Sequence, residues 1–154
     1  MAAGLSLRAA NLDRFARCFD AEVVRALAGR ELDDAIDTDG ELTDEQLCLG
    51  TARLLRDAGP WGQGFPEPSF DGAFDIDGAR VVGERHLKLS LRPSGSAARF
   101  DAMAFNFFDP EGGRDAPAGR VRLVYRLSVN EWRGVERLQL IVDHLQDEDS
   151  SAAA

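Results

Sequence analysis

Apolar residues in the first part of the chain recur with the period of amphipathic helices. After a short strand expected at residues 3–7, Asn11 is a favourable N-cap, and apolar positions follow a 3.6-residue period as far as Gly29. A second helix is predicted to begin at Thr43, because Thr43 and Gln46 have the spacing of a capping box. Its predicted buried side consists of Leu47, Leu54, Leu55 and Ala58.

Residues 59–68 separate this helical part from a region with a different period. The segment holds three glycines and three prolines, which exclude a helix or a central strand and favour a shaped linker. It is therefore predicted to be the boundary between residues 1–58 and residues 69–145. The polar and small residues 146–154 are expected to form a disordered tail.

Beyond the linker, apolar positions alternate with a period of two, which is typical of strands. The first strand is expected to bulge or bend near Asp77 and Gly78 and to turn at Gly83 and Glu84. A loop at residues 112–119 fills a wider gap between the third and fourth strands. The expected strands span residues 70–82, 86–92, 100–105, 121–129 and 138–145. This pattern predicts an α+β chain that ends in a five-stranded OB-type barrel, although other small barrels share the strand count.

The acidic excess of the chain is unevenly distributed. The net charge is −9, but residues 69–145 contain equal numbers of basic and acidic side chains. An anion is therefore expected to dock on this half, although a balanced total permits a basic face without requiring one. No apolar run is long enough to span a membrane and no signal peptide is recognised, so the protein is predicted to stay in the cytoplasm.

The acidic connection at residues 33–42 matches part of a calcium-binding loop. Three positions of an EF-hand are matched, by Asp37, Asp39 and Gly40. The first and last ligand positions would be Ala35 and Gln46, so two essential carboxylates are absent. A solvated acidic linker, with a short strand near Ile36, is therefore the better interpretation.

Residues capable of catalysis are sparse. A metal-dependent hydrolase needs several Asp and His side chains at one site, and a Ser or Cys nucleophile needs a His base. The chain has only His86 and His144, with neither an Asp-His-His triplet nor a Cys-His pairing. Cys18 and Cys48 stand alone and are predicted to be small buried residues. A complete active site is therefore not expected in this chain.

Cationic and aromatic residues follow the second and fourth expected strands. In the second strand three leucines should face one side, while the other side carries His86, Lys88, Ser90 and Arg92. The fourth strand has Arg126 among its outward positions and leads into a hairpin with Asn130, Trp132 and Arg133. Two interpretations stay open: a solvated outer face with a Trp packed on its own sheet, or a platform for base stacking and phosphate contacts.

Motifs across residues 59–145 resemble those of RecJ exonucleases, in the order of that family. They are Gly-Pro-Trp-Gly-Gln-Gly-Phe-Pro-Glu-Pro at 59–68, Val-Gly-Glu-Arg-His-Leu-Lys-Leu at 82–89, Ala-Phe-Asn at 104–106, Val-Asn-Glu-Trp-Arg-Gly at 129–134 and Leu-Gln-Leu at 138–140. The opening Met-Ala-Ala-Gly-Leu resembles the sequence that follows the Gly-Gly-His motif of the family's DHHA1 domain. Residues 1–58 would then be the end of a DHHA1-like domain with its connecting helices.

The resemblance implies an activity whose catalytic part lies elsewhere. The family cleaves single-stranded DNA from the 5′ end with Mn²⁺ or Mg²⁺ ions held by an upstream DHH domain. None of those ligands can be assigned in this chain, so no cofactor, metal ligand or catalytic residue is expected here, and a truncation is inferred. The implied partners are single-stranded DNA, the missing DHH and DHHA1 portion, and a single-strand-binding protein or a helicase, with no membrane.

The leading hypothesis is therefore a single-stranded DNA-binding OB module of a RecJ-like exonuclease that acts in repair and recombination. The expected DNA-binding residues are Arg85, His86, Lys88, Arg92, Arg126, Asn130, Trp132 and Arg133. The alternative is a scaffolding element that closes the nuclease ring and docks other proteins, with little DNA affinity of its own. An intact exonuclease would need a DHH domain supplied by another chain.

Overall fold

The computed structural model describes residues 4–27, 35–108 and 115–148. The chain divides into two compact units, Met1–Ile36 and Asp37–Ala154. This division falls well before the Gly/Pro linker. No helix of the described residues is long and apolar enough to cross a membrane.

The described residues of the first unit form one α-helix, α1 (Leu12–Leu27), which follows a 3₁₀ turn at Ala9–Asn11. The helix was predicted correctly, although its expected end near Gly29 lies outside the described residues. The strand expected at residues 3–7 is wrong for residues 4–7, which have no regular structure. None of the residues of α1 is buried, even though its apolar stripe is present and two of its aromatic rings stack 5.6 Å apart.

The second helix, α2 (Leu49–Ala58), begins six residues later than predicted. The backbone N–H of Thr43 donates to Oε1 of Gln46 at 2.9 Å, but this half of the capping box closes only an isolated turn. The chain then carries Leu47, only 4% exposed, into the core, and Cys48 is extended before the helix starts. Because of this shift, Ala52 is buried while the predicted Leu54 is exposed.

Three smaller expectations in the N-terminal half also fail. Ala58, predicted on the buried side of α2, is exposed, and residues 35–42, the described part of the acidic connection, contain no strand. Both Cys18 and Cys48 are exposed rather than buried. The local patterns around Cys18, Cys48 and Ala58 were taken to indicate burial, but these side chains are exposed.

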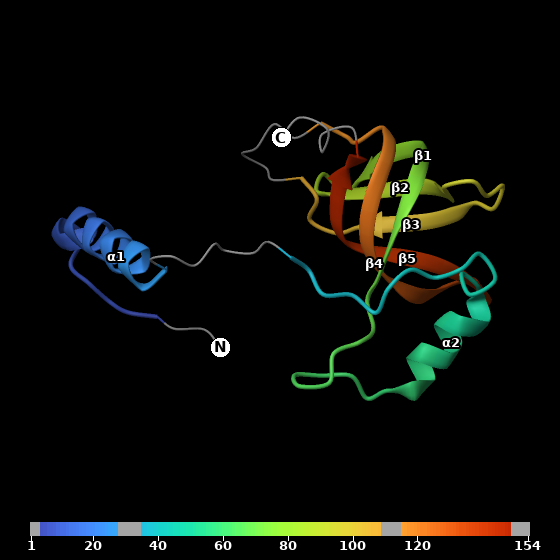
Figure 1. Cartoon of the computed structure of the whole chain (residues 1–154), viewed down its shortest axis with the longest axis horizontal. Coiled ribbons are helices and arrows are strands. Elements are labelled where there is room, and N and C mark those ends of the chain that lie inside the picture. Colours follow the sequence, from blue (N-terminus) through green and yellow to red (C-terminus); the bar gives the residue numbers. More distant parts are fainter. Residues whose placement is uncertain (1–3, 28–34, 109–114, 149–154) are drawn as a thin grey trace. The chain divides into compact units, whose positions relative to one another are not determined.

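Five strands form a closed barrel in the order β1-β2-β3-β5-β4 (Figure 1). They are β1 (Phe70–Val82), β2 (His86–Pro93), β3 (Phe100–Ala104), β4 (Gly119–Trp132) and β5 (Val135–Asp147). All pairings are antiparallel except β3 with β5, which is parallel. The predicted strands and the OB-type barrel are confirmed. β4 and β5 extend further than expected into a long hairpin, and Gln146 and Asp147 belong to β5 rather than to a tail.

The bend predicted in the first strand is a register shift between Ile76 and Gly78. The extra residue lets β1 pair with β4 along its first half and with β2 along its second half, which closes the barrel. The turn that follows has positive φ at Gly83 (58°) and Glu84 (66°), as tight hairpin turns require.

The barrel interior is filled by alternate residues of every strand. Leu87, Leu89 and Leu91 of β2 are fully buried, as predicted, and the ring of Phe74 meets the edge of Tyr125 at 5.4 Å. Burial raises the pKa of the Tyr125 phenol above its usual range. The side-chain direction in β2 therefore agrees with the alternation in the sequence, which leaves the polar residues of this strand on the outer face.

Helix α2 packs on the long β4–β5 hairpin within the same unit. Glu136 of β5 accepts from Nε of Arg53 at 2.6 Å and from Nη1 of Arg56 at 3.0 Å, and these two guanidinium groups lower its pKa. The Gly/Pro linker contains neither helix nor strand, and Nε1 of Trp61 donates to the carbonyl of Leu55 at 3.0 Å. The linker is thus folded back onto α2. The assignment of residues 1–58 to a DHHA1-like domain stays a prediction.

Candidate nucleic-acid interface

The β1–β2 turn and the end of β3 form one end of the predicted surface. Arg85 is exposed in the turn, and Nδ1 of His86 accepts from the backbone N–H of Asn106 at 3.0 Å. The His86 ring also meets the edge of the Phe105 ring at 5.3 Å. His86 thus fastens the turn to the end of β3, and Phe105 is the more exposed aromatic residue here. Sequence reasoning missed Phe105 as a candidate, although it is the last residue of the third expected strand; the observed β3 ends one residue earlier.

The β4–β5 hairpin carries the most exposed large hydrophobic side chain among the described residues of this surface. Trp132 is 71% exposed, and the guanidinium carbon of Arg133 lies 5.8 Å from the centre of its ring. Arg133 (φ 53°) and Gly134 (φ 75°) make the tight turn, so the tip is held by its backbone. Asn130 lies opposite Arg137 in the hairpin register. An exposed indole beside a guanidinium is suited to stack on a base next to a phosphate.

The strand register places the His86–Phe105 pair and the Trp132–Arg133 pair at opposite ends of one surface. Asp101 of β3 lies opposite Gln139 of β5, and the two strands run parallel. The hairpin tip therefore extends past the start of β3, whereas Phe105 follows its end. About eight residues of strand separate them, or at most about 26 Å at roughly 3.3 Å per residue. This length is suited to the short stretches of single strand that an OB fold holds.

Two of the predicted cations on β2 already have carboxylate partners. Nζ of Lys88 lies 2.8 Å from Oδ2 of Asp101, and Nη2 of Arg92 lies 3.3 Å from Oδ1 of Asp77. Nε of Arg92 is buried and has no hydrogen-bond partner among the described residues. A phosphate that used either cation would have to compete with a carboxylate of the protein.

Arg126 is not part of the same surface. Its guanidinium donates from Nε and Nη2 to the two carboxylate oxygens of Asp143 at 2.7 and 2.9 Å, and from Nη1 to Glu67 at 2.8 Å. The hydrogen bonds that it donates to Asp143 and, to a lesser degree, to Glu67 raise its pKa. In the barrel, β4 is separated from β2 by β1 on one side and by β3 and β5 on the other. The structure therefore does not bring Arg126 together with Lys88 and Arg92.

Four cations in the described part of the second unit have no ion pair: Arg80, Arg85, Arg133 and Arg137. Arg80 lies opposite Lys88 in the β1–β2 register. Arg137 lies one residue before the predicted start of the fifth strand and was therefore missed. Alternation in an extended fifth strand would have placed it on the outer face.

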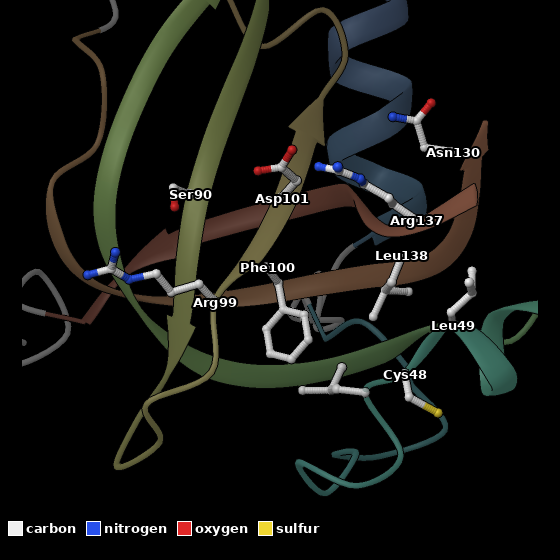
Figure 2. A pocket seen from close by; sticks show the side chains of 10 residues that line it. Cys48, Leu49, Ser90, Arg99, Phe100, Asp101, Asn130, Arg137 and Leu138 are labelled. Atoms are coloured by element: carbon white, nitrogen blue, oxygen red, sulfur yellow. The ribbon is translucent and has the colours of Figure 1, made fainter. Parts of the chain in front are cut away.

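A cleft of about 450 Å³ opens where β3 and β5 diverge toward the hairpin (Figure 2). Its apolar part includes Leu47, Phe100 and Leu138, and its polar part includes Arg99, Asp101, Asn130 and Arg137. The guanidinium of Arg137 extends across it toward Asp101 (Figure 2), whose carboxylate pairs with Lys88. The cleft thus has a basic rim with a single acidic side chain.

The described residues contain no group of three or more His, Cys, Asp or Glu side chains that could hold a metal ion. The donor set needed for the metal ions of a nuclease is therefore not met by this part of the chain. The chemistry that the outer face offers is binding of an anion and stacking of aromatic rings.

Comparison with known proteins decides the family. The family model for the RecJ OB domain matches residues 38–144. The chain belongs to the RecJ OB domain family. Its sequence is 46% identical over 145 residues to the single-stranded-DNA-specific exonuclease RecJ of Dickeya dadantii, covering 94% of this chain and 25% of that protein. The RecJ of Escherichia coli K12 is 43% identical with the same coverage.

Solved RecJ structures share the fold. RecJ from Thermus thermophilus in complex with Mn²⁺ matches 88% of this chain and 19% of its own, with 27% identity and a TM-score of 0.60. The complex of that protein with Mg²⁺ matches at 26% identity with the same TM-score. The resemblance seen in the sequence motifs is thus confirmed. The chain spans about a quarter of the length of the curated relatives that it matches.

Proposed function

We propose that the barrel is a single-stranded DNA-binding module of a RecJ-like 5′-3′ exonuclease in DNA repair and recombination. The observation that carries this proposal is Trp132, an indole 71% exposed at a hairpin tip with Arg133 beside it. Leaving such a ring in water is unfavourable unless a ligand covers it, and stacking on a base is sequence-tolerant. Single-stranded DNA is the substrate named for both of the relatives described above.

Affinity is expected to be modest and strongly dependent on salt. Only the unpaired cations can meet phosphates without breaking an ion pair, and the net charge of −9 opposes a polyanion at long range. Each phosphate neutralised on a single strand contributes about −0.7 to the slope of log K against log salt. A few contacts of this kind suit a module that holds a strand which must keep moving.

Catalysis is assigned to a part of the nuclease outside this chain. We infer that a DHH domain, with Mn²⁺ or Mg²⁺, supplies the cutting site, and that this chain alone does not degrade single-stranded DNA. The proposed partners are that DHH and DHHA1 portion and a single-strand-binding protein or a helicase. Nuclease activity that co-purified with the chain and vanished on changing a carboxylate within it would contradict this assignment.

The test is an equilibrium titration with a labelled single strand at two salt concentrations. Trp132→Ala should weaken binding by roughly 1–3 kcal/mol and leave the salt slope nearly unchanged, because it removes stacking. Arg133→Ala should weaken binding for all sequences and make the slope shallower by about one contact. Phe65→Ala, which removes an exposed aromatic ring from the linker, is the matched control and should bind like the parent.

The alternative is a scaffolding element of the nuclease with little DNA affinity of its own. It is favoured by the pairing of Lys88, Arg92 and Arg126 with carboxylates. If the Trp132 and Arg133 variants stay folded and bind as the parent does, the outer face is not the DNA platform and the scaffolding function takes its place.

A further inference from the structure

We propose that Asp101 is a built-in competitor for a DNA backbone phosphate at the cleft between β3 and the hairpin. The proposal rests on the proposed function, because it names what sets the affinity of that same surface. It assigns a role to a carboxylate in a place where a DNA-binding face would be expected to carry only neutral or basic groups.

The position of Asp101 carries the argument. Its side chain lines two neighbouring hollows of the outer face: the cleft with Arg99 and Arg137, and a second one with Arg80 and Lys88. Among the described residues, it is the only acidic one that lines either hollow. The side chain is 52% exposed, so its charge is open to solvent and to a ligand rather than part of the packed core.

The groups around Asp101 are those that would bind a phosphate. Nζ of Lys88 contacts Oδ2 at 2.8 Å, and the guanidinium of Arg137 points toward the carboxylate from the other side of the cleft (Figure 2). The structure describes no ion pair between Asp101 and Arg137, so this guanidinium keeps its donors. A phosphate presents oxygen acceptors like those of a carboxylate and is well matched to guanidinium and ammonium donors.

The carboxylate also explains how the cations can lie so close together. Arg80 and Lys88 are directly opposite each other in the β1–β2 register, and like charges in that arrangement destabilise a sheet. Asp101 offsets this repulsion in the free protein. When a strand binds, a phosphate does the same, so the carboxylate and the phosphate compete for one position. The free protein is thereby stable, and the bound strand is held weakly.

The test compares Asp101→Asn with the parent by titration of a labelled single strand over a range of salt. At roughly 0.1 M salt the variant should bind about fivefold tighter for every phosphate that the freed cations neutralise, and its salt slope should steepen by about 0.7 for each such phosphate. Asp147→Asn makes the same change in charge at the far end of β5 and should bind like the parent. Adding Lys88→Ala to Asp101→Asn should remove most of the increase in affinity, because Lys88 is the cation that the substitution frees.

Each result bears on one proposal or on both. If the parent binds the strand and Asp101→Asn behaves like Asp147→Asn, the competitor role is overturned while the DNA-binding function stands. If no variant binds, both proposals fall. A higher affinity without a steeper slope would also contradict the competitor role, because it would reflect the change in net charge alone.

A second arm distinguishes a backbone phosphate from a terminal one. Strands with and without a 5′-phosphate are titrated in parallel against Asp101→Asn. An equal increase in affinity for both strands supports an internal phosphate. An increase confined to the 5′-phosphorylated strand would overturn the assignment to the backbone.

Discussion

The two compact units of the chain follow equally clear sequence patterns but differ in what those patterns bury. Helix α1 has an apolar stripe, yet none of its residues is buried, and Phe19 in that stripe is 58% exposed. The strands of the barrel have an equally simple alternation, and Leu89 in β2 is 1% exposed. Periodicity thus determines the local conformation of a helix or strand and which of its faces is apolar. Burial of that face in a shared interior determines whether the element is stable.

The largest expected difference between the units is in hydrogen exchange. The hydrogen bonds of a 16-residue helix make it only marginally stable in water, so we expect the amides of α1 to exchange with almost no protection. The central strands of a barrel open only by global unfolding, which costs on the order of 5–15 kcal/mol in a typical domain. Native-state exchange followed residue by residue measures both. If the amides of α1 were as well protected as those of β2, the two units would not differ in stability and the prediction would be wrong.

A pair of truncations tests the same distinction through stability. Leu89→Ala removes a fully buried side chain and should lower the free energy of unfolding of the barrel by roughly 2–5 kcal/mol. Phe19→Ala removes a larger side chain from α1 and should change the free energy of unfolding of the barrel by no more than about 0.5 kcal/mol. Denaturant unfolding monitored by the two tryptophans, both in the second unit, measures each variant. Equal losses would show that α1 contributes to the same core.

The sequence allowed most of the barrel to be predicted. The alternation of β2 and the bulge near Asp77 depend on residues that are close together in the sequence, and both were predicted correctly. The start of α2 was not, because the Thr43–Gln46 box also closes an isolated turn. The choice between a turn and a helix depended on Leu47 entering the core, which is a tertiary contact.

The candidate interface could be predicted only in part, for a related reason. Alternation shows that Lys88 faces outward, but only the register of β2 with β3 shows that Asp101 lies close enough to pair with it. The same holds for Arg126, whose partners Glu67 and Asp143 come from the linker and from β5. The sequence therefore identified exposed cations without showing which of them are neutralised.

A smaller test concerns the edge of the second unit, where the chain from Asp37 joins the barrel. The N–H of Asp39 donates to the carbonyl of Ser69 at 2.7 Å, and its carboxylate accepts from the N–H of Ser69 at 3.0 Å. One residue beyond Asp39 and two beyond Ser69, the N–H of Asp71 donates to the carbonyl of Gly40 at 3.2 Å. These bonds fasten residues 39–40 along the start of β1.

The side chain of Asp71 completes this edge and makes it sensitive to acid. The hydroxyl of Thr38 donates to its carboxylate and lowers its pKa most, partial burial opposes the shift, and the ion pair with Arg122 lowers the pKa further. A carboxyl group with a lowered pKa in the folded state stabilises the fold above its ordinary value of 3.8, and this stabilisation is lost as pH falls through the lower folded value.

Asp71→Asn should therefore lower the free energy of unfolding at neutral pH by roughly 0.5–1 kcal/mol, because it weakens one partly exposed ion pair and one hydrogen bond. The gap between parent and variant should begin to narrow near pH 3.8 and should close as the pH falls through the lower folded pKa, below which the parent carboxyl is itself protonated. Asp115→Asn, at an exposed position without a described hydrogen bond or ion pair, is the matched control and should track the parent at every pH. Hydrogen exchange should show the loss at residues 38–42 and leave both α1 and the central strands unchanged. A gap that persisted well below that pH would mean that Asp71 acts through its shape or its backbone rather than through its charge.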